Sequence, residues 1–579
     1  MKILRAYIKE NIGILSLGAI FLTLNTFATL AIPFQISNII NLGIMKKDID
    51  MVYSTSIKMI IILIVGTATG IIANHFVALF ATNFTKKNRK LLVRNLESLT
   101  VDQVNDFGVA SLVTRMGNDN NNAQRLIVAF FQMILPSPIM AIISIFMTIK
   151  LSPTLALIPL FTILIFALAI VLTLFKSLPY ILKVQKKLDR MTLVLRERFI
   201  GAKIIRAFDN SKKERNKFND IAQEYTDNYI IINKKFALLS PMAFALMSVV
   251  ITLIIFFGAM KVLNNTLEIG SITAIVEYSL TTIAALIMSS MVLVQMPKAV
   301  VSIERIEEIL NVTSEIKDKE GLKDNSYYED ILKQNPISLT FDNVCFRYKG
   351  AEKQILKNIS FSIKAGERFA IVGATGSGKS TIAKVLLRLN DIENGKILIN
   401  GVNALDLPLN CLRNQISYTP QKAYLFSGKI KDNFRFTNKD MTDEEMIKVA
   451  KVAQSYDFID SLPDKFDSFV AQGGTNFSGG QKQRLSIARA LSKEANIYLF
   501  DDSFSALDYA TDAKLRKELK TFLKDKITII IAQRLNTIAD ADKIIVLKDS
   551  EITGMGTHQE LLESNQEYIE LAKSQGILE

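Results

Sequence analysis

Long apolar segments fill the first half of this chain. A helix that crosses a lipid bilayer needs about 20 mostly apolar residues. Six segments reach that length, and we expect membrane-spanning helices at about residues 12–42, 56–82, 127–150, 154–176, 239–263 and 270–296. The pattern therefore predicts an α-helical transmembrane domain over residues 1–310, which requires a lipid bilayer as its surroundings.

The segments that connect these spans alternate in length and charge. The connections after the first, third and fifth spans are short, whereas residues 83–126 and 177–238 are long, helical in pattern and rich in Lys and Arg. Basic loops are retained mainly on the cytoplasmic side of a membrane. We therefore expect long cytoplasmic helical extensions, both termini in the cytoplasm, and a multi-pass protein of the cell (plasma) membrane.

A few polar residues interrupt the spans. His75 and Glu277 are the plainest ionisable ones, and an ionisable group inside a membrane is by default a functional hypothesis. Both lie near predicted span ends, so we expect contact with the membrane surface or a cavity edge rather than a functional role. Asn25, Gln132 and Gln295 are candidates to line a substrate path.

The texture of the sequence changes after the last span. A helical pattern, VSIERIEEIL, leads into a linker at residues 311–336 whose polar stretch KDKEGLKDNSYYED predicts a loop. From residue 337 to 579, short β-rich runs alternate with helical ones. That alternation predicts a soluble α/β domain, and the expected cytoplasmic C-terminus places this domain on the cytoplasmic side.

Composition limits the class of protein further. The formal net charge is +13, hydrophobic residues make up 49%, and the mean hydropathy is +0.25. No block of basic residues is interleaved with aromatics and Trp is absent, so we expect no nucleic-acid partner. The two cysteines, Cys345 and Cys411, give neither a disulfide framework nor metal-ligand spacing, which is typical of a reducing cytosol.

The strongest local motif is GATGSGKS at residues 373–380, which follows an apolar strand, Phe369 to Val372, and opens a helix. This spacing is typical of a phosphate-binding P-loop, in which glycines turn backbone N–H groups inward and the helix N-terminus adds positive charge. Lys379 is expected to reach the β- and γ-phosphates and Ser380 to bind Mg²⁺. The predicted ATP-binding residues here are Gly373, Ala374, Thr375, Gly376, Ser377, Gly378, Lys379, Ser380 and Thr381.

A second informative stretch runs from Phe477 to Asp508. A Ser-Gly-Gly-Gln turn opens a helix expected at Arg484 to Leu491, and an apolar strand, Ile497 to Phe500, then delivers Asp501 and Asp502. A strand that ends in an aspartate is how a phosphate-binding α/β sheet holds Mg²⁺. We therefore assign Asp501 to the metal and Asp502 to the position of a water-activating base.

Taken together, these motifs resemble the ATP-binding cassette of ABC transporters, and the whole chain resembles a half-size ABC exporter, with six spans first and the cassette second. The resemblance implies that Tyr348 stacks on adenine and that Gln421, in the turn YTPQ, is a further metal or water ligand. It makes FSGGQ the signature motif, YLFDD the Walker B motif and SALD, Ser505 to Asp508, the D-loop. Segments near residues 107–119 and 196–208 resemble the helical extensions that dock on cassettes.

Two positions depart from the family pattern. Asp502 stands where the family has glutamate, and its carboxylate is shorter by one methylene. Gln533 stands where the family has a histidine that contacts the γ-phosphate. The chain has only two histidines, His75 in a span and His558, which we expect to cap or pack near the C-terminus.

These departures favour the degenerate-site subunit of a heterodimeric exporter, similar to the multidrug type of Gram-positive bacteria. The resemblance implies a second half-transporter with a consensus catalytic site, and a small amphipathic or hydrophobic substrate. The partner's ATP would be met by Ser478, Gly479, Gly480 and Gln481. Two alternatives stay open: a homodimeric exporter that uses Asp502 as a slow base, and an ATP-gated regulatory membrane subunit that transports nothing.

Overall fold

A computed structural model describes residues 1–293, 296–332 and 336–578. The chain divides into two compact units, and each is described here by itself. The helical unit consists of Met1–Ser98 and Val104–Thr313, and the α/β unit consists of Leu99–Gln103 and Ser314–Glu579.

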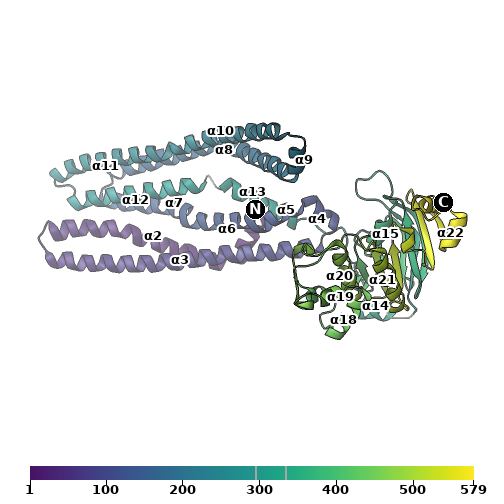
Figure 1. Cartoon of the computed structure of the whole chain (residues 1–579). Helices are drawn as coiled ribbons and strands as arrows, with labels where there is room; N and C mark the ends of the chain where they lie inside the picture. The colour runs from purple at the N-terminus through teal and green to yellow at the C-terminus, as the bar shows by residue number, and fades with distance from the viewer. Residues whose placement is uncertain (294–295, 333–335, 579) are drawn as a thin grey trace. The chain divides into compact units, whose positions relative to one another are not determined.

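The helical unit contains six long apolar helices that are able to cross a membrane (Figure 1). They are Ile12–Ile44, Ile49–Ser98, Val109–Leu151, Leu157–Ile200, Ser211–Leu263 and Ile269–Leu293. The predicted fold class, six apolar helices followed by an α/β domain, is confirmed. Several of these helices continue well past the apolar part, because the flanking polar residues keep the helical period.

The individual helices within these stretches are separated by π-helical turns and tight bends. Their bounds are α1 Lys2–Glu10, α2 Ile12–Asn38, α3 Ile49–Ser98, α4 Val101–Phe107, α5 Val109–Thr114, α6 Asn120–Ala129, α7 Pro136–Leu151, α8 Leu157–Ile200, α9 Ala202–Ala207, α10 Ser211–Ala237, α11 Leu239–Leu263, α12 Ile269–Leu293 and α13 Met296–Leu310. The π-helical turns are η1 Ile39–Ile44, η2 Arg115–Asp119 and η3 Phe130–Ile134.

Small and polar residues lie beside large apolar ones such as Phe80, Phe84 and Phe166 inside the helical unit, while many other large apolar side chains are exposed on its outside. The Gly270 N–H donates a hydrogen bond to Asn41 Oδ1 at 2.6 Å, and a Cβ at Gly270 would lie 2.5 Å from the Ser37 carbonyl oxygen. The Ser144 hydroxyl donates to the Tyr278 carbonyl at 3.0 Å. Such close contacts and interhelical hydrogen bonds hold helices together in lipid, where the hydrophobic effect between helices is weak.

The α/β unit is built on a six-stranded sheet in the order β12-β11-β3-β10-β9-β6, in which all pairs are parallel except β11 with β12. The strands are β3 Arg368–Gly373, β6 Ile416–Thr419, β9 Ile497–Asp501, β10 Ile527–Ile531, β11 Lys543–Lys548 and β12 Glu551–Gly556. Alternate residues of β3 and β10 enter separate apolar cores on the two faces of the sheet. This double burial explains why both strands read as continuous apolar runs.

Helices cover this sheet, and a smaller antiparallel sheet, β2-β1-β4-β5, packs in one of the two cores. The α-helices are α14 Asn325–Leu332, α15 Lys379–Leu386, α16 Leu409–Asn414, α17 Ile430–Phe434, α18 Asp443–Val452, α19 Tyr456–Asp460, α20 Gly479–Leu491, α21 Tyr509–Phe522, α22 His558–Ser564 and α23 Gln566–Ser574. The remaining strands are β1 Ser338–Phe346, β2 Leu356–Lys364, β4 Asn394–Ile399, β5 Val402–Asn403, β7 Gly428–Lys429 and β8 Phe469–Val470.

Helix α14 lies partly in the stretch that was expected to be a loop. Tyr328 and Leu332, four residues apart, are both buried in the core beside the smaller sheet. Residues at this spacing share one helix face. The surrounding residues are polar, so the sequence did not indicate this short amphipathic helix. Its apolar side is recognised only by its packing in the core.

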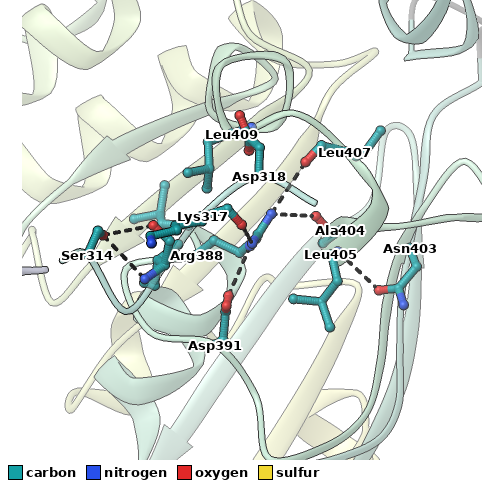
Figure 2. A network of polar contacts seen from close by, with 12 residues as sticks. Ser314, Lys317, Asp318, Arg388, Asp391, Asn403, Ala404, Leu405, Leu407 and Leu409 are labelled. Carbon is teal, nitrogen blue, oxygen red and sulfur yellow. Dashed lines mark hydrogen bonds and ion pairs between the residues drawn. The ribbon is translucent and has the colours of Figure 1, made fainter. Parts of the chain in front are cut away.

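A buried arginine fastens the linker to the α/β unit (Figure 2). Arg388 follows α15, is 3% exposed and has a φ of +46°. Its guanidinium donates to Asp391 Oδ1 at 2.9 Å and to the Lys317 carbonyl at 3.1 Å. It also donates to the carbonyls of Ala404 and Leu407. The linker therefore reaches the sheet along a fixed path beside the end of α15.

Candidate functional site

The loop between β3 and α15 needs glycine at its turning points. Gly376 and Gly378 have φ values of +87° and +101°, which side chains rarely adopt. A Cβ at Gly378 would also lie 2.6 Å from the Ile355 carbonyl oxygen. The tip, Ala374 to Gly376, is exposed while the residues behind it are buried. The loop is thus a backbone cradle that opens outward.

Lys379 lies at the start of α15, and its ammonium is turned back onto the loop. Nζ donates to the carbonyls of Gly373 and Ala374, both at 2.7 Å. Burial lowers the pKa of Lys379, and the nearby carboxylates of Asp502 and Asp501 act against that shift. The Ser377 hydroxyl oxygen is buried without a hydrogen-bond partner. A cation and a hydroxyl without a partner among the described residues, both beside a glycine cradle, fit a phosphate group.

Ser380 and Asp501 form the oxygen pair that fits Mg²⁺. The Ser380 hydroxyl donates to Asp501 Oδ1 at 2.9 Å, and the Tyr418 hydroxyl donates to Oδ2 at 3.4 Å. Burial raises the pKa of Asp501, an effect that the hydrogen bond from Ser380 opposes. Carboxylate and hydroxyl oxygens are the ligands that Mg²⁺ prefers together with phosphate. The assignment of Ser380 and Asp501 to the metal stays a prediction, with their geometry in its favour.

Asp502 is held by two amide side chains that come from different loops. Gln421 Nε2 and Gln533 Nε2 donate to the same oxygen, Oδ2, at 3.0 and 3.1 Å. Asp502 is 9% exposed, has a φ of +46°, and its pKa is raised by burial. The parallel order β10-β9-β6 places the ends of these strands at one edge of the sheet. The structure therefore brings together the two departures, Asp502 and Gln533, and the predicted ligand Gln421.

Gln575 is a residue of this region that sequence reasoning missed. Its Nε2 donates to the Gln533 carbonyl and its Oε1 accepts the Leu535 N–H, both at 2.8 Å. One side chain at the end of α23 thereby fixes the backbone on either side of Arg534. A glutamine four residues from the C-terminus carries no local signal, so only the fold reveals this contact. Tyr418 was missed for the same reason.

Tyr348 lies against the helix that follows the phosphate loop. Its hydroxyl is 3.3 Å from the Thr381 hydroxyl and accepts a hydrogen bond from Lys384 Nζ at 3.0 Å. Its ring packs edge-on against Phe346, with 4.8 Å between centroids. Tyr348 is therefore near the loop, and its stacking on adenine stays a prediction.

The signature stretch begins a helix earlier than expected. Helix α20 starts at Gly479, not at Arg484, because the Ser478 hydroxyl accepts the Gln481 N–H and the Gln481 side chain accepts the Ser478 N–H. This reciprocal pairing satisfies free N–H groups of the first turn. A Cβ at Gly479 would have nothing within 4 Å, and Gly480 meets only the Ala506 carbonyl and Leu507 at 3.4 Å or more. The start of α20 is open along its backbone.

The other candidates fall into place individually. His558 Nδ1 lies 2.6 Å from the buried Tyr568 hydroxyl, so it packs within the C-terminal helices. Asn25 donates to the Gly66 carbonyl between α2 and α3. His75 is exposed on α3 and Glu277 is half-buried in α12. Gln132 lines a cavity of the helical unit, whereas Gln295 lies outside the described residues.

The segments expected to dock on cassettes contain short helices. Residues 109–114 form α5 and residues 202–207 form α9. The segment Leu99–Gln103, shortly before α5, belongs to the α/β unit. There Asp102 Oδ2 accepts a hydrogen bond from Asn390 Nδ2 at 2.8 Å. The docking of α5 and α9 stays a prediction.

Comparisons with known proteins cover nearly the whole chain. Residues 15–286 match the model of the ABC transporter transmembrane region, and residues 356–505 match that of the ABC transporter. An uncharacterized ABC transporter ATP-binding protein of Bacillus subtilis is 32% identical over 94% of this chain and 93% of its own length. An ATP-dependent lipid A-core flippase of Mannheimia succiniciproducens is 26% identical over 98% of this chain and 95% of its own.

A solved structure shares the fold. A bacterial Atm1-family ABC exporter with ATP bound aligns with a TM-score of 0.79 at 24% identity, and the alignment covers 96% of this chain and 97% of that one. At this identity the likeness speaks for the arrangement of helices and strands alone.

Proposed function

We propose that this chain is the degenerate-site subunit of a heterodimeric exporter. The chain belongs to the ABC transporter family and is a half-size exporter, with one membrane domain and one ATP-binding domain. It holds ATP and Mg²⁺ on its own phosphate loop and hydrolyses that ATP slowly. Its signature residues serve a competent site on the partner. The pair exports amphipathic or hydrophobic substrates across the plasma membrane, with the termini and both ATP-binding domains in the cytoplasm.

The observation that carries the proposal is the environment of Asp502. A general base must lie within about 2.6–3.2 Å of the proton that it takes, or act through one water. The Asp502 side chain is one methylene shorter than that of glutamate, so its carboxylate reaches less far, and the amide groups of Gln421 and Gln533 both donate to its Oδ2. Gln533 cannot supply the charge that histidine carries in its protonated form. Slow hydrolysis follows from these features together.

Several features of the phosphate loop support the proposed binding of ATP. The glycine cradle, Lys379 and the oxygen pair of Ser380 and Asp501 support binding of the phosphates and Mg²⁺. Bound Mg²⁺ would neutralise charge on the phosphate oxygens. Tight binding without turnover shifts the transporter between its states through a difference in affinity alone.

The signature stretch supports the second half of the proposal. Ser478 and Gln481 organise the first turn of α20, and Gly479 leaves its backbone accessible. The N-terminus of a helix favours a negatively charged ligand. A phosphate presented by a partner subunit would meet these N–H groups, so the stretch remains useful even if this chain's own site is slow.

One observation favours the alternative of a homodimer with Asp502 as a slow base. Burial raises the pKa of Asp502, and a higher pKa strengthens a carboxylate as a proton acceptor. The lost reach and the two amide donors oppose this gain. We weigh the lost reach and the donors more heavily, because hydrogen bonds to a carboxylate stabilise its charged form and so weaken it as a proton acceptor.

The experiment is to purify the complex from native membranes and weigh it by native mass spectrometry. We expect one copy of this chain with one copy of a different half-transporter. That partner should carry glutamate after its Walker B aspartate and histidine in its switch loop. A complex of two copies of this chain would contradict the proposal, as would a partner with the same two departures. Export into sealed vesicles separates an exporter from a regulatory subunit.

A further inference from the structure

The helical unit encloses a cavity of about 780 Å³ between α6, the turn η3 and α13. Tyr229 of α10 and Val292 of α12 complete its wall. Binding sites for small molecules have volumes of roughly 300–1,000 Å³, so the cavity has the size of a ligand site. All of its lining residues belong to one unit of the chain.

The charge of this cavity has one sign. Arg125 and Lys298 are its cationic lining residues, and no Asp or Glu is among the described residues that line it. Both side chains are exposed, and neither forms an ion pair in the described part of the chain. Both cations lie just outside the predicted spans, where the cavity meets the polar edge of the bilayer, and two cations without an acidic neighbour in the described lining attract an anion there.

The amides of the wall are already bonded to neighbouring helices. Gln132 donates to Asn74 at 2.9 Å and Asn122 donates to Ser302 at 3.1 Å. Asn121 accepts from the Arg89 guanidinium at 3.0 Å. These bonds hold the amides in place, and the two cations are the charged donors among the described lining residues.

Apart from Gln124 and Tyr229, the remaining lining is apolar, and it comes from both sides of the cavity. Its residues are Leu126, Val128, Ala129, Met133, Val292, Met296 and Ala299. Unbranched methionine side chains adapt to ligands of irregular shape. The cavity therefore offers an anion-binding edge next to an adaptable apolar surface.

We propose that this cavity binds amphipathic anions, with Arg125 and Lys298 on the acidic headgroup and the methionine side on the apolar body. The inference rests on the proposed export function and narrows its substrate class. An anionic membrane lipid and a free amphiphilic anion share this chemistry, and the experiment distinguishes the two sources.

The absence of tryptophan from the chain gives a direct binding assay. A Tyr229→Trp variant places this chain's one tryptophan in the wall of the cavity, and the fluorescence of the complex without the substitution is subtracted as background. The full chain, with its partner, is placed in nanodiscs of phosphatidylcholine. Quenching of the tryptophan is measured with two brominated dodecyl probes, an alkyl phosphate and an alkyl trimethylammonium, in the absence of ATP.

We expect the phosphate probe to quench at a concentration about tenfold lower than the ammonium probe, a difference of about 1.4 kcal/mol. In Arg125→Gln/Lys298→Gln this preference should disappear, and in Arg125→Lys/Lys298→Arg it should persist. The matched control Arg94→Gln/Lys261→Gln removes one arginine and one lysine outside the cavity lining and should retain it. Added phosphatidylglycerol should compete with the probe if the natural ligand is a lipid, and should leave binding unchanged if the ligand is a free amphiphile.

Equal quenching by both probes, or a preference that survives loss of both cations, would overturn the inference. ATP-dependent export by the same complex keeps this result separate from the proposed function. Export without an anion preference contradicts the cavity assignment alone. Anion binding without any ATP-dependent export contradicts the exporter proposal and leaves the cavity assignment standing.

Discussion

The α/β unit contains two neighbouring regions that differ in how closely they follow the family pattern. The phosphate region, Gly373 to Thr381 with Asp501, retains its glycines, its lysine and its oxygen pair. The hydrolytic region, Asp502 with Gln421 and Gln533, has a shortened carboxylate held by two amide donors. The two regions lie on adjacent residues of one strand end. The contrast teaches that binding ATP and activating water are separable demands, and that one can weaken while the other is kept.

The largest effect is expected from the signature stretch, which we propose acts at the partner's ATP site. Gly479→Glu places a negative charge where the partner's γ-phosphate is expected, and removing such anion stabilisation costs about 10²–10³ in rate. ATP turnover of the purified pair should fall by about a hundredfold. Thr521→Glu is the control, because it adds the same charge at an exposed position of α21 outside the site, and turnover should stay near its original value. An unchanged rate in Gly479→Glu would remove this chain's signature from the working site.

Next in size is the effect of the lysine in the phosphate region. Lys379→Ala removes a charged donor worth about 3 kcal/mol, or roughly a hundredfold in affinity. Photolabelling of this chain by an azido-ATP analogue should fall accordingly, while labelling of the partner persists. Lys396→Ala, on strand β4, is the control. Undiminished labelling of the Lys379 variant would mean that this loop is not the ATP site.

The hydrolytic region predicts a gain of activity. Asp502→Glu with Gln533→His restores reach and charge, and a positioned base contributes about 10²–10⁴-fold. Turnover at this chain's own site should rise at least about tenfold, measured in a pair whose partner site has been inactivated. Each single substitution should give less than the double. No rise in the double variant would place the defect elsewhere, for example in the partner's signature.

A smaller effect is expected from Gln575, which positions the backbone around Gln533 and Leu535. Gln575→Leu removes two hydrogen bonds worth about 1 kcal/mol each. Only part of this energy affects the barrier to hydrolysis, so we expect roughly a fivefold loss in the rate of ATP turnover. The loss should appear in kcat and leave KM unchanged, because Gln575 contacts Gln533 and Leu535 and not the phosphate loop. Gln566→Leu is a matched glutamine on the same helix that contacts only Glu570. A loss confined to KM would assign Gln575 to binding.

The fold class could be predicted from the sequence more completely than the arrangement of the site residues. Six apolar stretches and the GATGSGKS loop are local signals, because span length and glycine spacing follow from bilayer thickness and phosphate geometry. The convergence of Gln421 and Gln533 on one oxygen of Asp502 depends on the order of β6, β9 and β10. No local pattern encodes that order.

Other details needed the tertiary context as well. The capping of α20 by Ser478 and Gln481 was hidden by two glycines that look like a turn. The contact of Gln575 joins positions 40 residues apart. The cavity that contains Arg125 and Lys298 lies between helices α6 and α13, which are far apart in the chain. Such features arise from packing, so they appear only in the folded structure.

The most direct test of the central claim is a single-turnover measurement on this chain purified alone with Mg²⁺ and radiolabelled ATP. Pumps of ordinary activity turn over at about 1 s⁻¹ or faster. The account predicts that nucleotide is bound and stays ATP, with turnover at least about a hundredfold slower than that. Rapid conversion to ADP at about 1 s⁻¹, abolished by Lys379→Ala, would contradict it and identify a homodimeric pump.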